Sequence, residues 1–295
     1  MQFWFPKGYL RWLAHGLGGR GTVATTSGGP FHMTTVARSS RGPADPEHAF
    51  FLNAAFAMAL VIGAGFTVQL ILGRSSFAAP PLVHAHAVVF MGWVTLYLVQ
   101  TGLVATGHRV LHRRLGWVAA GWIALMLPLG VMVTVALVRQ GHAPFFFRPL
   151  QFLVFDPATL AGFAGLTVAA IGLRRRADWH KRLNFSAMAL LLGPGFGRLL
   201  PMPLLSPWAW EATLAACAIF PLVGVLRDLR QTGKVHPAWM WGLGAMAGCL
   251  VMTELITYSP VGMTLYRQAT AGSPGAAVAP LGFPAPPVKP AAPSR

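Results

Sequence analysis

Residues 83–107 read VHAHAVVFMGWVTLYLVQTGLVATG and contain no lysine, arginine, aspartate or glutamate. A helix rises about 1.5 Å per residue, so this stretch is longer than the roughly 30 Å hydrocarbon core of a bilayer. Inside lipid the backbone must satisfy its own polar groups, and a helix does so within a single segment. The stretch therefore predicts a membrane-spanning helix.

Six further apolar runs of similar length flank it, at 49–72, 115–138, 151–173, 184–204, 208–227 and 237–259. Together they predict an all-α, polytopic membrane helix bundle of about seven transmembrane helices. The run 151–173 is the weakest, because Asp156 and Pro157 lie near its start. The alternative is six spans, with that run re-entrant or interfacial.

The composition agrees with a membrane protein. Of 295 residues, 55% are hydrophobic and 10% are charged, where a soluble domain carries about 25% charged residues. The net charge of +16 does not indicate a nucleic-acid partner, because the basic residues cluster in short segments between apolar runs. Two cysteines, both inside apolar runs, exclude a disulfide framework or a zinc ribbon.

The positive charge alternates along the chain and sets an orientation. The basic segments are 1–48, 108–116, 174–183 and 227–237, and they hold 16 of the 23 lysines and arginines. With seven spans all four lie on one side, which the positive-inside rule makes the cytoplasmic side of a bacterial-type inner membrane. The N-terminus is then inside and the C-terminus outside, and the inner loops can meet anionic lipid headgroups.

Three parts follow from this pattern. Residues 1–48 are predicted to be a cytoplasmic, largely disordered segment, because they are polar, glycine-rich and basic. Residues 49–260 form the transmembrane domain. Residues 261–295, rich in proline and alanine, are predicted to be a disordered tail.

One face of the second helix has candidate cofactor-binding residues. At 100° per residue, His86 shares a helix face with Trp93, Tyr97 and Gln100, which lie 7, 11 and 14 positions further on. Position 108 returns to about the same face. His180 lies at the matching inner end of the fifth run. The predicted cofactor-binding set is His86, Trp93, Tyr97, Gln100, His108 and His180.

A second set is predicted from ionisable residues at membrane depth, which are costly there and therefore candidates for function. This buried polar layer comprises His84, Asp156, Arg198, Glu211 and Glu254. The segment GPGFGR at 193–198 weakens its helix, because it combines a proline with three glycines. We expect Arg198 to pair with one of the three acids, either as a structural ion pair or as part of a ligand site.

On the inner side, His108 and His112 are four residues apart, and His180 lies at the corresponding end of another helix. HxxxH with a third histidine is a metal-ligand spacing. However, the adjoining arginines and lysine disfavour a cation, so an interfacial basic loop is the favoured interpretation and no metal site is assigned.

Four motifs carry a resemblance: HAHAVVFMGW at 84–93, LHRRLG at 111–116, RRRADWHKRL at 174–183 and GPGFGRLLP at 193–201. With these, residues 49–260 resemble a family of uncharacterised bacterial multi-pass inner-membrane proteins, which implies no catalytic residue. Histidines at helix ends are also loosely similar to membrane b-type cytochromes and haem-handling proteins, and this implies haem as a cofactor.

Three functions are compatible with these features. The first is binding of a haem or quinone-like cofactor in the polar interior, and the second is a non-enzymatic transporter, sensor or assembly factor with a buried ion-pair core. The third is an outer-face metal-dependent hydrolase using His84 or His86 with the three acids, although the chain contains neither HExxH nor GxSxG.

Overall fold

The computed structural model describes residues 46–74 and 78–285. Nearly all of the predicted N-terminal segment 1–48 and the last ten residues of the predicted tail therefore lie outside the described residues. The described chain is helical throughout and contains no strand, which confirms the all-α bundle.

Nine α-helices and two short 3-10 helices follow one another along the described chain. They are α1 Pro46–Ile71, α2 Pro81–Ala105, α3 Arg109–Arg139, α4 Pro149–Gly172, α5 Ala177–Leu190, α6 Gly193–Leu199, η1 Met202–Leu205, α7 Ala209–Thr232, α8 Pro237–Thr257, α9 Pro260–Thr270 and η2 Pro274–Ala277. Proline occupies the first turn of most of these helices, where its missing N–H costs nothing. Gly107 and Gly233 adopt φ of +82° and +68° and allow the chain to turn sharply.

Six of the helices, α1, α2, α3, α4, α7 and α8, are long and apolar enough to cross a membrane. Large apolar side chains on these helices are exposed, among them Leu60, Val88, Leu125, Val168 and Leu255. Such a surface is unfavourable in water and favourable in lipid. The chain is therefore a multi-pass membrane protein.

The weakest predicted run, 151–173, forms the continuous helix α4. It is not re-entrant, although Pro157 lies inside it. A transmembrane helix tolerates proline because its neighbours compensate for the lost backbone bond. The Asp156 carboxylate accepts a hydrogen bond from Thr134 of α3, 3.0 Å away.

The predicted fifth run, 184–204, is the one that departs from a single spanning helix. α5 ends at Leu190 and α6 begins at Gly193, so the run is divided between two short helices and η1. The break falls at Gly193-Pro194, where glycine weakens the helix and proline cannot donate a backbone hydrogen bond. Among the described helices of sufficient length, six rather than seven meet the criteria of a full span.

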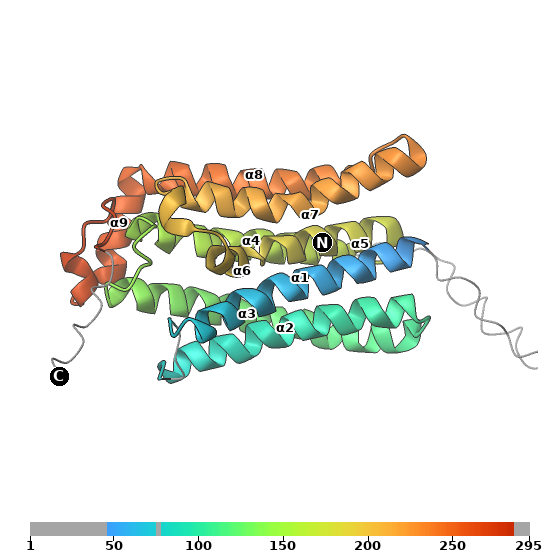
Figure 1. Ribbon diagram of the computed structural model, residues 1–295, viewed down its shortest axis with the longest axis horizontal. Coiled ribbons are helices and arrows are strands. Elements are labelled where there is room, and N and C mark those ends of the chain that lie inside the picture. The colour runs from blue at the N-terminus through green and yellow to red at the C-terminus, as the bar shows by residue number, and fades with distance from the viewer. Residues whose placement is uncertain (1–45, 75–77, 286–295) are drawn as a thin grey trace, which may run out of the picture. The chain divides into compact units, whose positions relative to one another are not determined.

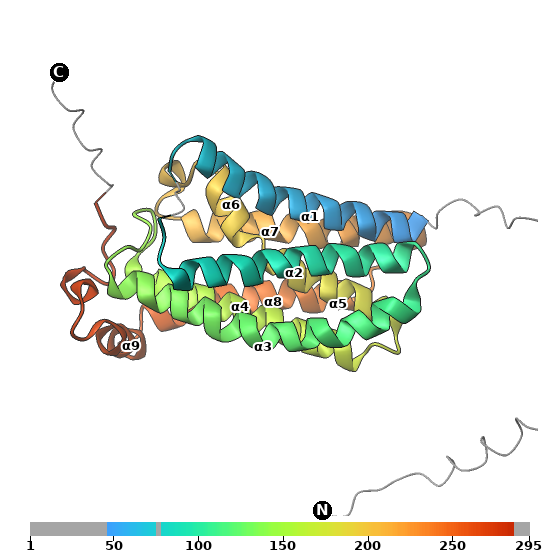
Figure 2. The same cartoon turned by 90° about the horizontal axis from the view of Figure 1, so that it is seen from below.

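α5 lies in the interior of the bundle. Residues 183–192, from α5 into the turn that follows it, are buried apart from Asn184, and α5 packs against α4, α7 and α8. After the break, α6 packs against α1 and α7 instead. Figures 1 and 2 show that α5 and α6 together return the chain from one end of the bundle toward the other, where α7 begins.

The α2–α3, α4–α5 and α7–α8 turns and the start of α1 all lie at the same end of the bundle, on the right in Figure 1. We call it the basic end, because it carries Arg113, Arg114, Arg174–Arg176, Lys181, Arg182, Arg227, Arg230 and Lys234. The opposite end, which we call the distal end, carries the α1–α2, α3–α4 and α6–α7 connections.

The segment that follows α8 differs from the predicted disorder. Residues 260–270 form the helix α9, and η2 follows it. The buried Tyr266 hydroxyl donates to the carbonyl oxygens of Gly275 (3.1 Å) and Val278 (3.3 Å). Composition alone did not reveal this helix. The proline content of the tail suggested disorder, although proline at the first position is compatible with a helix start.

Candidate functional site

Three polar side chains of α2, His86, Trp93 and Gln100, lie seven residues apart on one face that is turned into the bundle. The Trp93 ring stands edge-on to Phe163 of α4, with centroids 5.1 Å apart. A Cβ atom on Gly116 of α3 would lie 3.6 Å from the Gln100 amide nitrogen. Tyr97, on the same face, packs against the apolar core.

This row contains buried polar atoms without hydrogen-bond partners in the described part of the chain. They are Nδ1 of His86, Nε1 of Trp93 and Oε1 of Gln100. Buried polar atoms in folded proteins are nearly always hydrogen-bonded, and leaving one unpaired costs about 1–3 kcal/mol. We name His86, Trp93 and Gln100 the α2 row.

At the basic end, His112 in the first turn of α3 and His180 in the first turn of α5 bring two imidazole rings together. Their centroids are 6.2 Å apart and their planes are nearly perpendicular, at 85°. His180 Nδ1 lies 2.8 Å from the carbonyl oxygen of Ala170, near the end of α4. His112 Nδ1 is buried and, within the described residues, has no hydrogen-bond partner.

His108 does not lie on the α2 face. α2 ends at Ala105, and the turn at Gly107 makes His108 the exposed residue that precedes α3. Its Nδ1 lies 2.9 Å from the Thr106 hydroxyl. The helical period used in the sequence prediction therefore cannot be extended to position 108, nor do His108 and His112 share a continuous helix face.

The predicted polar layer divides into separate groups. One lies in the distal half, where Thr134 holds Asp156 and the His86 ring stacks on Phe90 with centroids 4.1 Å apart. Arg198 is near enough to Asp156 and His86 for their charges to interact.

Arg198 makes none of the ion pairs described for residues 46–74 and 78–285. Its guanidinium donates to the carbonyl oxygen of Pro194 (2.8 Å) and lies over the Phe66 ring of α1, 4.0 Å from the centroid. The expected pairing of Arg198 with an acid is therefore wrong. A cation–π contact and a backbone carbonyl replace it.

The second group lies at the distal end. Gln151 Nε2 donates to Glu254 Oε1 (2.9 Å), and Glu211 is close enough to Glu254 for their charges to interact. Oε2 of Glu211 and Nε1 of the neighbouring Trp210 are buried without partners in the described chain. Gln151 and Trp210 fall within the predicted runs 151–173 and 208–227 and were not predicted as site residues.

His84 is exposed on α2, on a face different from that of His86. The described residues contain no group of three histidines, cysteines or acids that could hold a metal ion. The hydrolase hypothesis required such a group near the outer surface, so no observation supports it.

A buried ion pair that the sequence did not reveal joins α5 to α7 at the basic end. Arg182 donates from Nε to Asp228 Oδ2 (3.1 Å) and from Nη2 to Oδ1 (2.9 Å). The Trp239 indole (2.9 Å) and the His236 backbone N–H (3.3 Å) also donate to Asp228. Only 9% of the Arg182 side chain and 6% of the Asp228 side chain are exposed.

Glu47 and Asp178 extend this network. Lys181 Nζ lies 2.6 Å from Glu47 of α1, and His236 Nε2 lies 2.9 Å from the carboxylate of Asp178. The His236 hydrogen bond lowers the pKa of Asp178. The sequence signal for the ion pair was the acid at 228 within the basic segment 227–237, which was predicted to lie at the inner membrane surface beside anionic headgroups.

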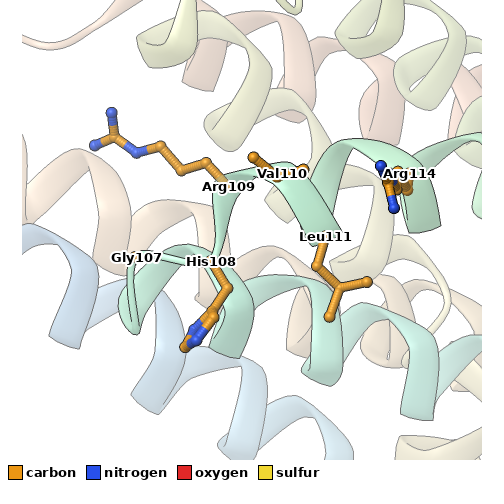
Figure 3. A pocket seen from close by; sticks show the side chains of 6 residues that line it. All are labelled: Gly107, His108, Arg109, Val110, Leu111 and Arg114. Atoms are coloured by element: carbon orange, nitrogen blue, oxygen red, sulfur yellow. The ribbon is translucent and has the colours of Figure 1, made fainter.

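A surface hollow of about 350 Å³ lies at the α2–α3 turn. Figure 3 shows the side chains of His108, Arg109 and Arg114 pointing away from one another around it, rather than toward a common centre. The hollow does not include His112 or His180, so it is distinct from the imidazole pair.

No protein-family model, no curated protein and no solved structure matches this chain. The resemblance drawn from the four motifs therefore stays a prediction, and the chain is shown to be a multi-pass membrane protein with six candidate spans.

Proposed function

We propose that this chain is a multi-pass protein of a bacterial-type inner membrane that holds a flat redox cofactor, haem or quinone-like, along the α2 row. The unpaired polar atoms of His86, Trp93 and Gln100 carry the proposal. Lipid chains cannot satisfy these atoms, and the adjoining helices, as far as the structure describes them, do not. A ligand with polar groups at its edges and an apolar face can.

The proposed arrangement in the membrane has seven crossings, with α5 and α6 forming one broken crossing. The N-terminus lies inside and the C-terminus outside, because the positive-inside rule assigns the basic end to the cytoplasm. The hollow at the α2–α3 turn then faces the inner leaflet, where Arg109 and Arg114 can contact anionic headgroups.

A haem or quinone supplies one-electron transfer when bound. The residues of this chain have separate roles around it. Trp93 presents an indole N–H donor, Gln100 an amide that can donate and accept, and His86 an imidazole that can take up a proton. Because Trp93 packs on Phe163 and Gln100 lies against α3, these groups are held in place before a ligand arrives.

Purification in detergent tests the proposal. We expect an absorption band of haem, or an isoprenoid quinone in an organic extract, at about one equivalent per chain, and a lower content in Gln100→Ala. Thr95→Ala is the matched control, because Thr95 is exposed on another face of α2 and bonds only to the Met91 carbonyl. A chain that carries neither cofactor and binds neither added haemin nor decylubiquinone contradicts the proposal.

A second candidate function is proton or small-anion passage through the distal half. The observation in its favour is the pair of ionisable residues, Asp156 and Arg198, held near each other without an ion pair beside the break in the fifth run. In proteoliposomes, the wild-type chain should then dissipate a pH gradient faster than empty vesicles, and Asp156→Asn should abolish the difference. Equal rates for wild type and empty vesicles exclude this function.

A further inference from the structure

We infer that the α2–α3 turn and the face of α3 that follows it bind one anionic phospholipid, with its headgroup in the hollow at the turn and an acyl chain along α3. This inference rests on the membrane arrangement proposed above, whose headgroup contact it makes specific, and it does not depend on the redox cofactor. The basic turn then holds one lipid at a defined site, in addition to attracting the membrane surface in general.

The polar half of the site is a concentration of positive charge without a counter-charge. Arg109 and Arg114 line the hollow, and Arg113 lies between them in the sequence. The chain has no aspartate or glutamate between Glu47 and Asp156, and none of the three arginines forms an ion pair with another described residue. The charge of the turn therefore favours an anion as the ligand.

The hollow offers space for a headgroup between the arginines. Its volume is about 350 Å³, and all of its lining residues belong to the segment 107–114. Figure 3 shows Arg109 and Arg114 extending on different sides of it. Like charges without a counter-charge repel one another, and both side chains are exposed and can reorient. A phosphate group in the hollow has a guanidinium within reach on each side, and arginine binds phosphate through paired hydrogen bonds.

An exposed apolar stripe leads away from the hollow along α3. Leu111, Val118, Leu125 and Met132 follow one another at intervals of seven residues, about two helical turns, and each is slightly more than half exposed. Leu111 also lines the hollow, so the stripe begins there. The rise from Leu111 to Leu125 is about 21 Å, which exceeds half of the roughly 30 Å hydrocarbon core. The stripe is therefore long enough for an acyl chain of the leaflet at the basic end.

An exposed tryptophan marks the level of the membrane surface at the same place. Trp117 of α3 is exposed, and the Arg174 guanidinium lies over its ring, 5.9 Å from the centroid. Tryptophan is enriched where headgroups meet hydrocarbon, because its ring is apolar and its N–H is polar. Trp117 lies between Arg114 and Val118 in the sequence, so the boundary between headgroups and hydrocarbon falls near this turn of α3.

The two halves together favour a lipid over the other occupants of this surface. A free phosphate ion uses the arginines but leaves the stripe uncovered. A second copy of the chain, related by a two-fold axis along the membrane normal, covers the stripe but brings Arg109 and Arg114 of both copies to the same level, where like charges repel. An anionic phospholipid satisfies the arginines and covers the stripe with one molecule.

Native mass spectrometry of the full purified chain, stripped of lipid in detergent, tests the inference with dioleoyl phosphatidylglycerol as the probe. We expect one bound lipid per chain at concentrations where dioleoyl phosphatidylcholine, which has no net charge, does not bind. Arg109→Gln combined with Arg114→Gln should weaken binding by about tenfold or more. Arg230→Gln combined with Lys234→Gln is the matched control, because it removes two exposed charges from the same end and should leave binding nearly unchanged.

Several results overturn the inference while leaving the redox proposal intact. One is equal weakening in the two double variants, and another is equal binding of the two lipids by the wild type, a comparison that requires no variant to fold. Displacement of the lipid by glycerol 3-phosphate would identify a free phosphate as the ligand, and a dimer that excludes the lipid would assign the stripe to a second copy. A chain that binds the lipid but carries no cofactor contradicts the redox proposal alone.

Discussion

Asp228 accepts four hydrogen bonds, two from Arg182, one from Trp239 and one from the backbone of His236. Such saturation is what keeps a carboxylate charged when it is nearly inaccessible. A buried ion pair adds little over an apolar pair of the same size, but removing one partner leaves the other charge unpaired. A conservative change at Asp228 or Arg182 should therefore have a large effect on stability.

We predict that Asp228→Asn destabilises the protein by about 3 kcal/mol, the lower end of the range for a broken buried pair, because the Arg182 guanidinium keeps only the partly exposed Glu47 carboxylate, 3.6 Å away, as a counter-charge. Thermal unfolding in detergent, followed by tryptophan fluorescence, measures the change. Asp178→Asn is the matched control, since 53% of the Asp178 side chain is exposed. Equal melting temperatures for Asp228→Asn and Asp178→Asn would show that the buried pair does not stabilise the fold.

The pair of Asp178 and His236 predicts a pH effect of known sign. The His236 hydrogen bond holds the pKa of Asp178 below its ordinary value near 3.8. A carboxyl group with a lowered pKa in the folded state stabilises the fold above that ordinary value, and this contribution is lost as the pH falls through the folded pKa. The melting temperature of Asp178→Asn should therefore depend less steeply on pH below about pH 4 than that of the wild type. Identical slopes refute this assignment.

At the scale of the elements, the contact between α1 and α6 decides where the broken fifth run goes. A Cβ atom on Gly65 would stand 2.7 Å from the carbonyl oxygen of Gly195, and one on Gly195 would stand 3.0 Å from that of Val61. Two backbones approach this closely only where both residues lack side chains. These glycines let α6 leave the interior and lie on α1.

We predict that Gly65→Ala destabilises the protein by about 1–3 kcal/mol, because the added methyl group must push two backbones apart. Gly63→Ala is the control two residues away, where a Cβ atom meets nothing within 4 Å. The control should be neutral or slightly stabilising, since alanine is a better helix former. Equal melting temperatures for Gly65→Ala and Gly63→Ala would contradict the close packing of α6 on α1.

The apolar runs predicted most of the helices, because hydrocarbon-length apolar segments have few alternatives to helix. The break in the fifth run was also anticipated from Gly193 and Pro194. The sequence placed His112 and His180 at corresponding helix ends, but it could not show that their rings meet, because only tertiary packing brings them together. Arg182 was hidden for a related reason: a basic run looks the same in sequence whether its arginines face headgroups or a buried acid.

For the whole molecule, the distribution of charge and the helix directions both support the proposed seven-crossing arrangement. Every described turn at the basic end carries arginines or lysine, while the distal end has few. If α5 and α6 cross as one unit, the polar groups of α2, α3 and α4 face the interior of a seven-crossing bundle.

Labelling with a membrane-impermeant maleimide in intact cells tests the seven-crossing arrangement most directly. Leu204→Cys and Val261→Cys, at positions that are 83% and 70% exposed, should be labelled from outside, whereas Thr106→Cys and Arg175→Cys should be labelled only after permeabilisation. The unaltered chain is the control, because its two cysteines are buried. Labelling of Leu204→Cys and Val261→Cys only after permeabilisation would place them on the side of the basic end and contradict the account.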